Sequence, residues 1–103
     1  MVTSLLPLMH ALDALGSPAR REILQTLRIS PLAVGELATR FPVSRPAISR
    51  HLRVLEDAGL VEHQARGARS VYAVRVQGFA SVRDFLDEFW ETALSRLEEL
   101  AKK

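Results

Sequence analysis

The sequence predicts a mainly helical domain with one small β-hairpin after its midpoint. Three observations support this fold class. Apolar residues recur at three- and four-residue steps along most of the chain, which is the period of a helix. Between residues 60 and 76 they alternate every second residue, which is the period of a strand. Serine, proline and glycine separate these segments, and with 103 residues, 48% of them hydrophobic, we expect a single domain over 1–103.

Two helices are expected in the first third of the chain. The first covers about 4–15 and is interrupted early by Pro7. The second follows Ser17, whose hydroxyl can accept a hydrogen bond from the first turn, and Pro18 suits its first position. The Ser30-Pro31 pair stops it. Its predicted buried stripe consists of Ala19, Ile23, Leu24 and Leu27.

The next two helices are joined by a short connector, Pro42-Val43, and therefore form a helix-turn-helix. The first is short and covers 34–41. The second covers 44–58, where Ser44 can cap its start and Gly59 can adopt the left-handed conformation that ends a helix. Its buried stripe consists of Ile48, Leu52 and Leu55.

The exposed face of helix 44–58 carries arginines and hydroxyls in place of mixed charge. Arginine pairs bidentately with guanine, and serine donates to or accepts from several bases, so this face suits the major groove of DNA. The predicted base-reading residues are Arg45, Pro46, Ser49 and Arg50. Residues expected at the DNA backbone or in the wing are Thr39, Ser44, His51, Arg53, Arg66 and Arg69.

Segments 60–66 and 70–76 are predicted to pair as a β-hairpin across the turn 67–69. On the second strand, the covered face is expected to hold Tyr72, Val74 and Val76. A hairpin directly after a helix-turn-helix is a wing. Arg66 and Arg69 at its tip can reach a phosphate or a minor groove; the alternative is that they are ordinary solvated turn residues.

Charge is distributed unevenly along the chain. From Pro18 to Arg75 there are ten arginines and five acidic residues, whereas from Val76 onward there are four basic and six acidic residues. A basic middle segment favours a polyanionic partner. The alternative is that the arginines reflect genome composition, since the chain has lysine only at Lys102 and Lys103.

A last helix is expected at about 79–101, with a wide and aromatic apolar stripe. A small helical core with one hairpin offers too little area to cover that stripe, and an exposed aromatic face is an aggregation hazard. We therefore expect a homodimer formed by the first and last helices. Its predicted interface contains Leu5, Leu8, Leu12, Phe85, Phe89, Trp90, Leu94 and Leu97. The alternative is that the aromatic residues belong to the protomer's own core.

Four segments together resemble the ArsR family of small bacterial winged-helix repressors. They are PLAVGELA at 31–38, VSRPAISRHLRVL at 43–55, AGLV at 58–61 and RGARSVY at 66–72. The resemblance implies a winged helix-turn-helix fold of four helices, a two-stranded wing and a fifth helix. It also implies a homodimer joined through the terminal helices, which represses by binding a partly palindromic operator, often in its own promoter.

The usual metal-site patterns of that family are missing. Its metal sensors place two cysteines in the third helix, or Asp and His ligands along the last one, whereas this chain has no cysteine and its last helix has no histidine. The Phe89-Trp90 pair resembles a cysteine-free subgroup. His10, His51 and His63 fall on separate elements, so we expect no metal and no cofactor. The alternative is a non-standard site between His10 and the partner's last helix, through Asp84, Asp87, Glu88 and Glu91.

The sequence offers no catalytic residues. It has no thiol, no glycine-rich phosphate loop and no supported Ser/His/Asp arrangement, so we expect a protein that is not an enzyme. Residues 1–15 lack the features of a secretory signal, and no apolar run approaches the roughly 20 residues that span a bilayer. A soluble, cytoplasmic protein is expected, with double-stranded DNA and a second copy as partners and no assigned effector. A winged helix that docks an acidic protein is the alternative function.

Overall fold

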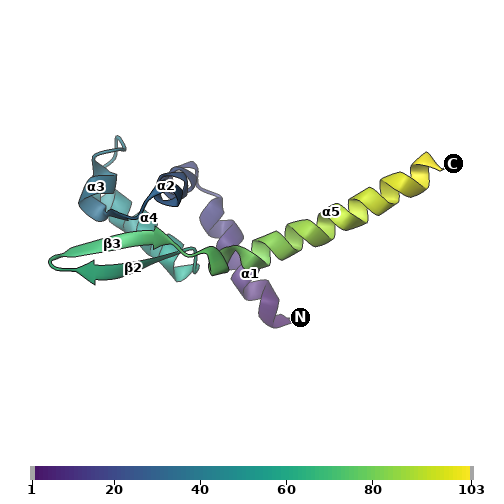
Figure 1. Cartoon of the computed structure of the whole chain (residues 1–103), viewed down its shortest axis with the longest axis horizontal. Helices are drawn as coiled ribbons and strands as arrows, with labels where there is room; N and C mark the ends of the chain where they lie inside the picture. Colours follow the sequence, from purple (N-terminus) through teal and green to yellow (C-terminus); the bar gives the residue numbers. More distant parts are fainter. Residues whose placement is uncertain (1, 103) are drawn as a thin grey trace.

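The molecule consists of a small body from which one long helix projects (Figure 1). This computed structural model describes residues 2–102, and its side chains from Leu5 onward. The extents are 63 × 29 × 20 Å. The wing tip and the C-terminal end of the long helix lie at opposite ends (Figure 1). The elements are α1 (Val2–Leu15), α2 (Pro18–Ile29), β1 (Leu32–Ala33), α3 (Val34–Ala38), α4 (Arg45–Asp57), β2 (Val61–Arg66), β3 (Arg69–Val74), the 3-10 helix η1 (Val76–Phe79) and α5 (Ala80–Ala101).

The hydrophobic core surrounds α4. Ile48, Leu52 and Leu55 are at most 1% exposed and form the buried stripe that the sequence predicts. The rest of the core comes from the other elements of the body, namely Ala11, Ala14, Ile23, Leu24, Leu27, Leu32, Leu37, Leu60 and Val61. Since α5 supplies none of these buried residues, the body has a core without it.

The second predicted helix is confirmed, and the first needs one correction. Ser17 Oγ accepts a hydrogen bond from Arg20 N at 3.3 Å, and α2 begins at Pro18. Of its predicted stripe, Ile23, Leu24 and Leu27 are buried and Ala19 is half-buried. Pro7 does not interrupt α1, which starts at Val2. Proline there removes one backbone hydrogen bond near the start of a helix, where neighbouring residues are exposed to water.

The third helix is shorter than predicted. It ends at Ala38 and not at residue 41, because Thr39 Oγ1 donates to Glu36 O at 2.7 Å and Arg40 N donates to Leu37 O at 3.0 Å, which turns the chain away. Phe41, expected inside this helix, lies beyond it and packs against the core.

A two-residue strand, β1, was not predicted. Leu32 and Ala33 pair antiparallel with Tyr72 and Val71 of β3, so the sheet has three strands in the order β1-β3-β2. Two residues are too few to show alternation, and their partners lie about forty positions further along the chain. β1 joins the base of the wing to the helix-turn-helix.

The predicted ends of α4 are confirmed. Ser44 Oγ accepts a hydrogen bond from Ala47 N at 3.2 Å, and Pro46 lies in the first turn. After α4, Gly59 has φ of 78°. This left-handed conformation allows the chain to turn directly into the wing, since Leu60 N donates to Leu55 O at 3.0 Å.

The hairpin is confirmed, with two corrections. Arg66 pairs with Arg69, so the turn has two residues, Gly67 and Ala68, and not three. A positive φ at the first turn residue, 65° at Gly67, suits a two-residue hairpin. Val76 does not continue the strand; it begins η1 and is 75% exposed. The ladder stops at Val74 because its last partner, Val61, follows directly on the turn after α4.

The junction between the wing and α5 is tightly packed against the end of α4. Arg75 N donates to Leu60 O at 2.9 Å, and Arg75 Nη1 donates to Gly59 O at 3.3 Å. A Cβ atom at Gly78 would lie 1.7 Å from Gly59 O, so no larger residue fits there. The turn through η1 also moves the start of α5 to Ala80, one residue later than predicted.

Helix α5 projects out of the body (Figure 1), and the body leaves its apolar stripe uncovered. No residue between Ala80 and Ala101 is buried. Phe85 is 44% exposed, Phe89 is 64% exposed and Trp90 is 65% exposed. Only the start of this region, at Phe79 and Val82, packs partly against the core. The alternative in which the aromatic residues fill the protomer's own core is therefore wrong.

We predict that Gly78→Ala destabilises the protein by about 3 kcal/mol, because the added methyl group forces the backbone of η1 away from Gly59. Thermal unfolding followed by circular dichroism measures this change. The matched control is Gly67→Ala at the wing tip, where no atom lies within 4 Å of the new Cβ and only the positive φ of 65° is unfavourable. The control should cost roughly 1 kcal/mol. Equal losses in the two variants would contradict the tight junction.

Candidate nucleic-acid interface

The exposed side of α4 presents the residues predicted to read bases. Arg45, Ser49 and Arg53 follow one another at four-residue steps, with Pro46 and Arg50 beside them, and all five are exposed. The opposite side of the helix is anchored in the core. A helix held in this way can enter a major groove with its cationic side foremost.

His51 differs from its neighbours on α4. It is half-buried, and its pKa is lowered from the ordinary value of 6.5, first by burial and then by the positive charges of Arg20 and Arg50. The imidazole is therefore mostly uncharged at neutral pH. As a backbone-contact residue it would act through a hydrogen bond and not through charge.

An ion pair links the wing tip to the helix-turn-helix. Of its two residues, sequence reasoning selected Arg69 and missed Glu36. Arg69 Nη2 donates to Glu36 Oε1, and the same oxygen accepts a hydrogen bond from Ala33 N at 3.0 Å. A glutamate three residues after the N-cap residue, Ala33, is a local signal for the bond to Ala33. The contact with Arg69 has no local signal, because the two residues are 33 positions apart. Arg66 is exposed at the tip.

A polar groove of about 450 Å³ lies between α3, α4 and the wing tip. It brings together residues for which the sequence predicts different roles: Arg45 and Ser49 as base-reading residues and Arg69 as a phosphate contact. Ser70, which sequence reasoning did not select, also lines it. The other lining residues are Ala33, Val34, Gly35, Glu36 and Ala68.

The base of the wing is also linked to the helix-turn-helix, in this case to α4. His63 Nδ1 lies 2.5 Å from Glu56 Oε2, and the His63 ring packs on Tyr72 with the ring centroids 5.1 Å apart. Burial and, second, the charge of Glu56 raise the pKa of the Tyr72 hydroxyl. The far end of α4 and the first wing strand are therefore fixed to each other.

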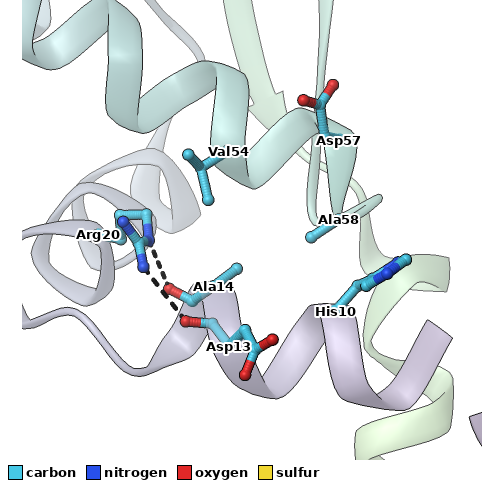
Figure 2. A pocket seen from close by; sticks show the side chains of 7 residues that line it. All are labelled: His10, Asp13, Ala14, Arg20, Val54, Asp57 and Ala58. Carbon is cyan, nitrogen blue, oxygen red and sulfur yellow. Dashed lines mark hydrogen bonds between the residues drawn. The ribbon is translucent and has the colours of Figure 1, made fainter. Parts of the chain in front are cut away.

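Figure 2 shows another cavity, of about 310 Å³, between α1, α2 and the end of α4. His10, Asp13 and Asp57 lie around it, while Arg20 donates to Ala14 O at 2.7 Å and to Asp13 O at 3.2 Å. Within the part of the chain that the structure describes, no three His, Cys, Asp or Glu residues lie together as a metal site. Among residues 2–102, no helix is both long and apolar enough to cross a membrane.

Comparison with known proteins identifies the family. Residues 17–63 match the model of the bacterial regulatory proteins of the arsR family. The HTH-type transcriptional regulator Rv2034 of Mycobacterium tuberculosis is 48% identical over 91 residues, which are 88% of this chain and 85% of that protein. The chain belongs to the ArsR family.

Two further comparisons extend this assignment. The transcriptional repressor SdpR of Bacillus subtilis is 33% identical over 65 residues, which are 63% of this chain and 72% of SdpR. The solved structure of Mb0332 from Mycobacterium bovis, a homodimeric winged helix-turn-helix DNA-binding domain, superimposes with a TM-score of 0.71 at 28% identity and covers 88% of each chain. This ArsR-family protein is therefore a transcriptional regulator with a winged-helix DNA-binding domain, and not an enzyme.

The lowered pKa of His51 predicts how stability depends on pH. Protonation is easier in the unfolded chain than in the folded one, so the contribution of His51 to stability is intact above pH 6.5 and decreases as the pH falls below that value. Titration of the imidazole by NMR should give a pKa below 6.5 for His51. Arg50→Gln should bring it closer to 6.5. A value at or above 6.5 in the unmodified protein would contradict this environment.

Proposed function

We propose that this ArsR-family regulator is a homodimeric repressor that binds a partly palindromic operator, in front of its own or a neighbouring operon. The observation that carries the proposal is the arrangement of two surfaces on one chain. α4, which exposes Arg45, Arg50 and Arg53, lies in the body, and α5, whose apolar stripe is uncovered, projects away from the body (Figure 1). The relative SdpR is a transcriptional repressor, which supports repression, and the Mb0332 domain is homodimeric, which supports the dimer.

The dimer interface would be formed by α1 and α5, which contact each other in the protomer. A two-fold axis places the same apolar surface of each copy against the other. Of the predicted interface residues, Leu8 is half-buried, and the exposed ones are Leu5, Leu12, Phe85, Phe89, Trp90, Leu94 and Leu97. Leu86 and Leu100, which belong to the same predicted apolar stripe of the last helix, are as exposed, and so are Leu6 and Met9 of α1, which sequence reasoning left out.

In this dimer, each α4 would enter one major groove, with the two helices about 34 Å apart, one turn of the duplex. Base edges would be contacted by Arg45, Pro46, Ser49 and Arg50. The backbone or minor groove would be contacted by Thr39, Ser44, His51, Arg53, Arg66 and Arg69. All of these side chains are exposed except His51, which is half-buried. The Thr39 hydroxyl already donates a hydrogen bond to Glu36 O, so its oxygen can only accept another. Because a phosphate has no hydrogen to donate, Thr39 would contact the DNA backbone through a bound water.

We further propose that residues 1–103 act as one DNA-binding domain in the cytoplasm, with dimerisation helices at about 4–15 and 79–101. The small core around α4 is shared by elements from α1 to β2, so no part of the body has a separate core. DNA is the ligand and no cofactor is required in this proposal.

The proposal predicts that Arg50→Ala weakens binding to the operator by about 1–3 kcal/mol and reduces the preference for it over scrambled DNA, because a base contact is lost. Fluorescence anisotropy with duplexes from the region upstream of the gene measures both quantities. The control is Arg96→Ala on α5, which removes the same charge far along the helix from the body, and which should leave the preference unchanged.

The same titrations test DNA binding itself. If the dimer neutralises about 6–10 phosphates, the affinity of the unmodified protein should fall by roughly 10³- to 10⁵-fold between 50 and 200 mM salt. If no upstream duplex forms a tight complex with the protein, even at low salt, the alternative function, docking of an acidic protein, would be favoured. An unchanged sequence preference in Arg50→Ala would remove this residue from the base-reading group.

Trp90→Glu should convert the dimer to a monomer, because it places a charge in the centre of the apolar stripe. Trp90 is 65% exposed in the protomer, so the body should remain folded. Sedimentation equilibrium measures the mass, and circular dichroism confirms the helix content. Asp87→Lys changes charge on the polar side of the same helix and should remain dimeric. A dimeric Trp90→Glu variant would place the interface elsewhere.

A further inference from the structure

The groove between the helix-turn-helix and the wing tip contains both an anion and the groups that bind one. Arg45, Arg69, Ser49 and Ser70 supply two guanidinium groups and two hydroxyls, and the Glu36 carboxylate lies among them. A Cβ atom built on Gly35 would be 3.6 Å from Arg45 Nη1, so the Arg45 guanidinium lies over the start of α3.

The two guanidinium groups are in different states. Among residues 5–102, Arg45 forms no ion pair, whereas Arg69 is paired with Glu36. That pair is exposed to solvent, with side-chain exposures of 58% for Arg69 and 49% for Glu36. Exposed pairs of this kind are weak and screened by salt. Glu36 Oε1 also accepts the hydrogen bond of Ala33 N at 3.0 Å, so the carboxylate keeps a donor if Arg69 leaves it.

We propose that this groove binds one backbone phosphate in each half of the operator, and that Arg69 exchanges Glu36 for that phosphate when DNA binds. Arg45, Ser49 and Ser70 donate to the same phosphate. This inference revises the proposed function at two residues: it moves Arg45 and Ser49 from the base-reading group to the backbone group, and it leaves Pro46 and Arg50 at base edges. The inference rests on the proposed function, since its ligand is duplex DNA.

The exchange gives Glu36 a definite role. In the free protein it holds the wing tip against α3, and in the complex its negative charge opposes the incoming phosphate. It therefore lowers the affinity for DNA while it keeps the wing in place. A carboxylate that merely supported the bound conformation would do the opposite, because its loss would weaken the complex.

Glu36→Gln tests this role directly. The amide keeps an oxygen that can accept the Ala33 hydrogen bond, so α3 keeps its N-terminal contact, but the charge that holds Arg69 is lost. We expect the variant dimer to bind operator duplex about two- to thirtyfold more tightly, the range for two copies of an exposed ion pair. The matched control is Glu62→Gln on β2, which also removes one negative charge, but from the wing and outside the groove. It should have a smaller effect.

Arg69→Gln provides the second measurement. If Arg69 binds a phosphate in each subunit, its loss should make the slope of log affinity against log salt shallower by about 0.9 per subunit, or about 1.8 for the dimer. Melting temperatures of all variants show whether they are folded.

The outcomes separate the two proposals. Binding by the unmodified protein together with no gain in Glu36→Gln beyond the Glu62→Gln control, or an unchanged salt slope in Arg69→Gln, would overturn the exchange and leave the DNA-binding role intact. Failure of the unmodified protein to bind any upstream duplex would overturn both.

Discussion

The packing of one side of α4 into the core is the constraint on which the rest of the structure depends. Ile48, Leu52 and Leu55 are almost completely buried, which fixes the rotation of this helix about its axis. Once that rotation is fixed, Arg45, Ser49 and Arg53 must face outward together. The same packing places the end of α4 against β2 and η1, so the wing and α5 both begin from a point that the core determines.

Features written in neighbouring residues could be predicted from the sequence. The cap at Ser44, the left-handed Gly59 and the apolar stripe of α4 depend on residues within a few positions of one another, and all three are confirmed. Features formed by distant residues could not. β1 exists only because β3 lies beside it, and Val76 leaves the strand because its partner strand has ended.

In the candidate site, too, the features set by neighbouring residues could be predicted and those set by distant residues could not. The helical period predicts which side chains α4 exposes, but it does not show that Arg69 reaches Glu36, 33 residues earlier in the chain. Residues assigned separately to bases and to phosphates line one groove, because the hairpin folds back toward the start of α4. The exposure of α5 is predicted from surface area and not from periodicity. The apolar stripe of this helix is larger than the area that the small core can cover. The exposure of Phe89 and Trp90 agrees with that estimate.

The independence of the core from α5 has a consequence for biosynthesis. Among residues 5–102, every fully buried residue precedes α5 in the chain, so these core residues are all synthesised before the aromatic helix. The exposed apolar stripe of α5 thus leaves the ribosome after the rest of the protomer is able to fold. A nascent chain exposes this helix on a folded body, which shortens the time during which the stripe and an unfolded core are available together for aggregation.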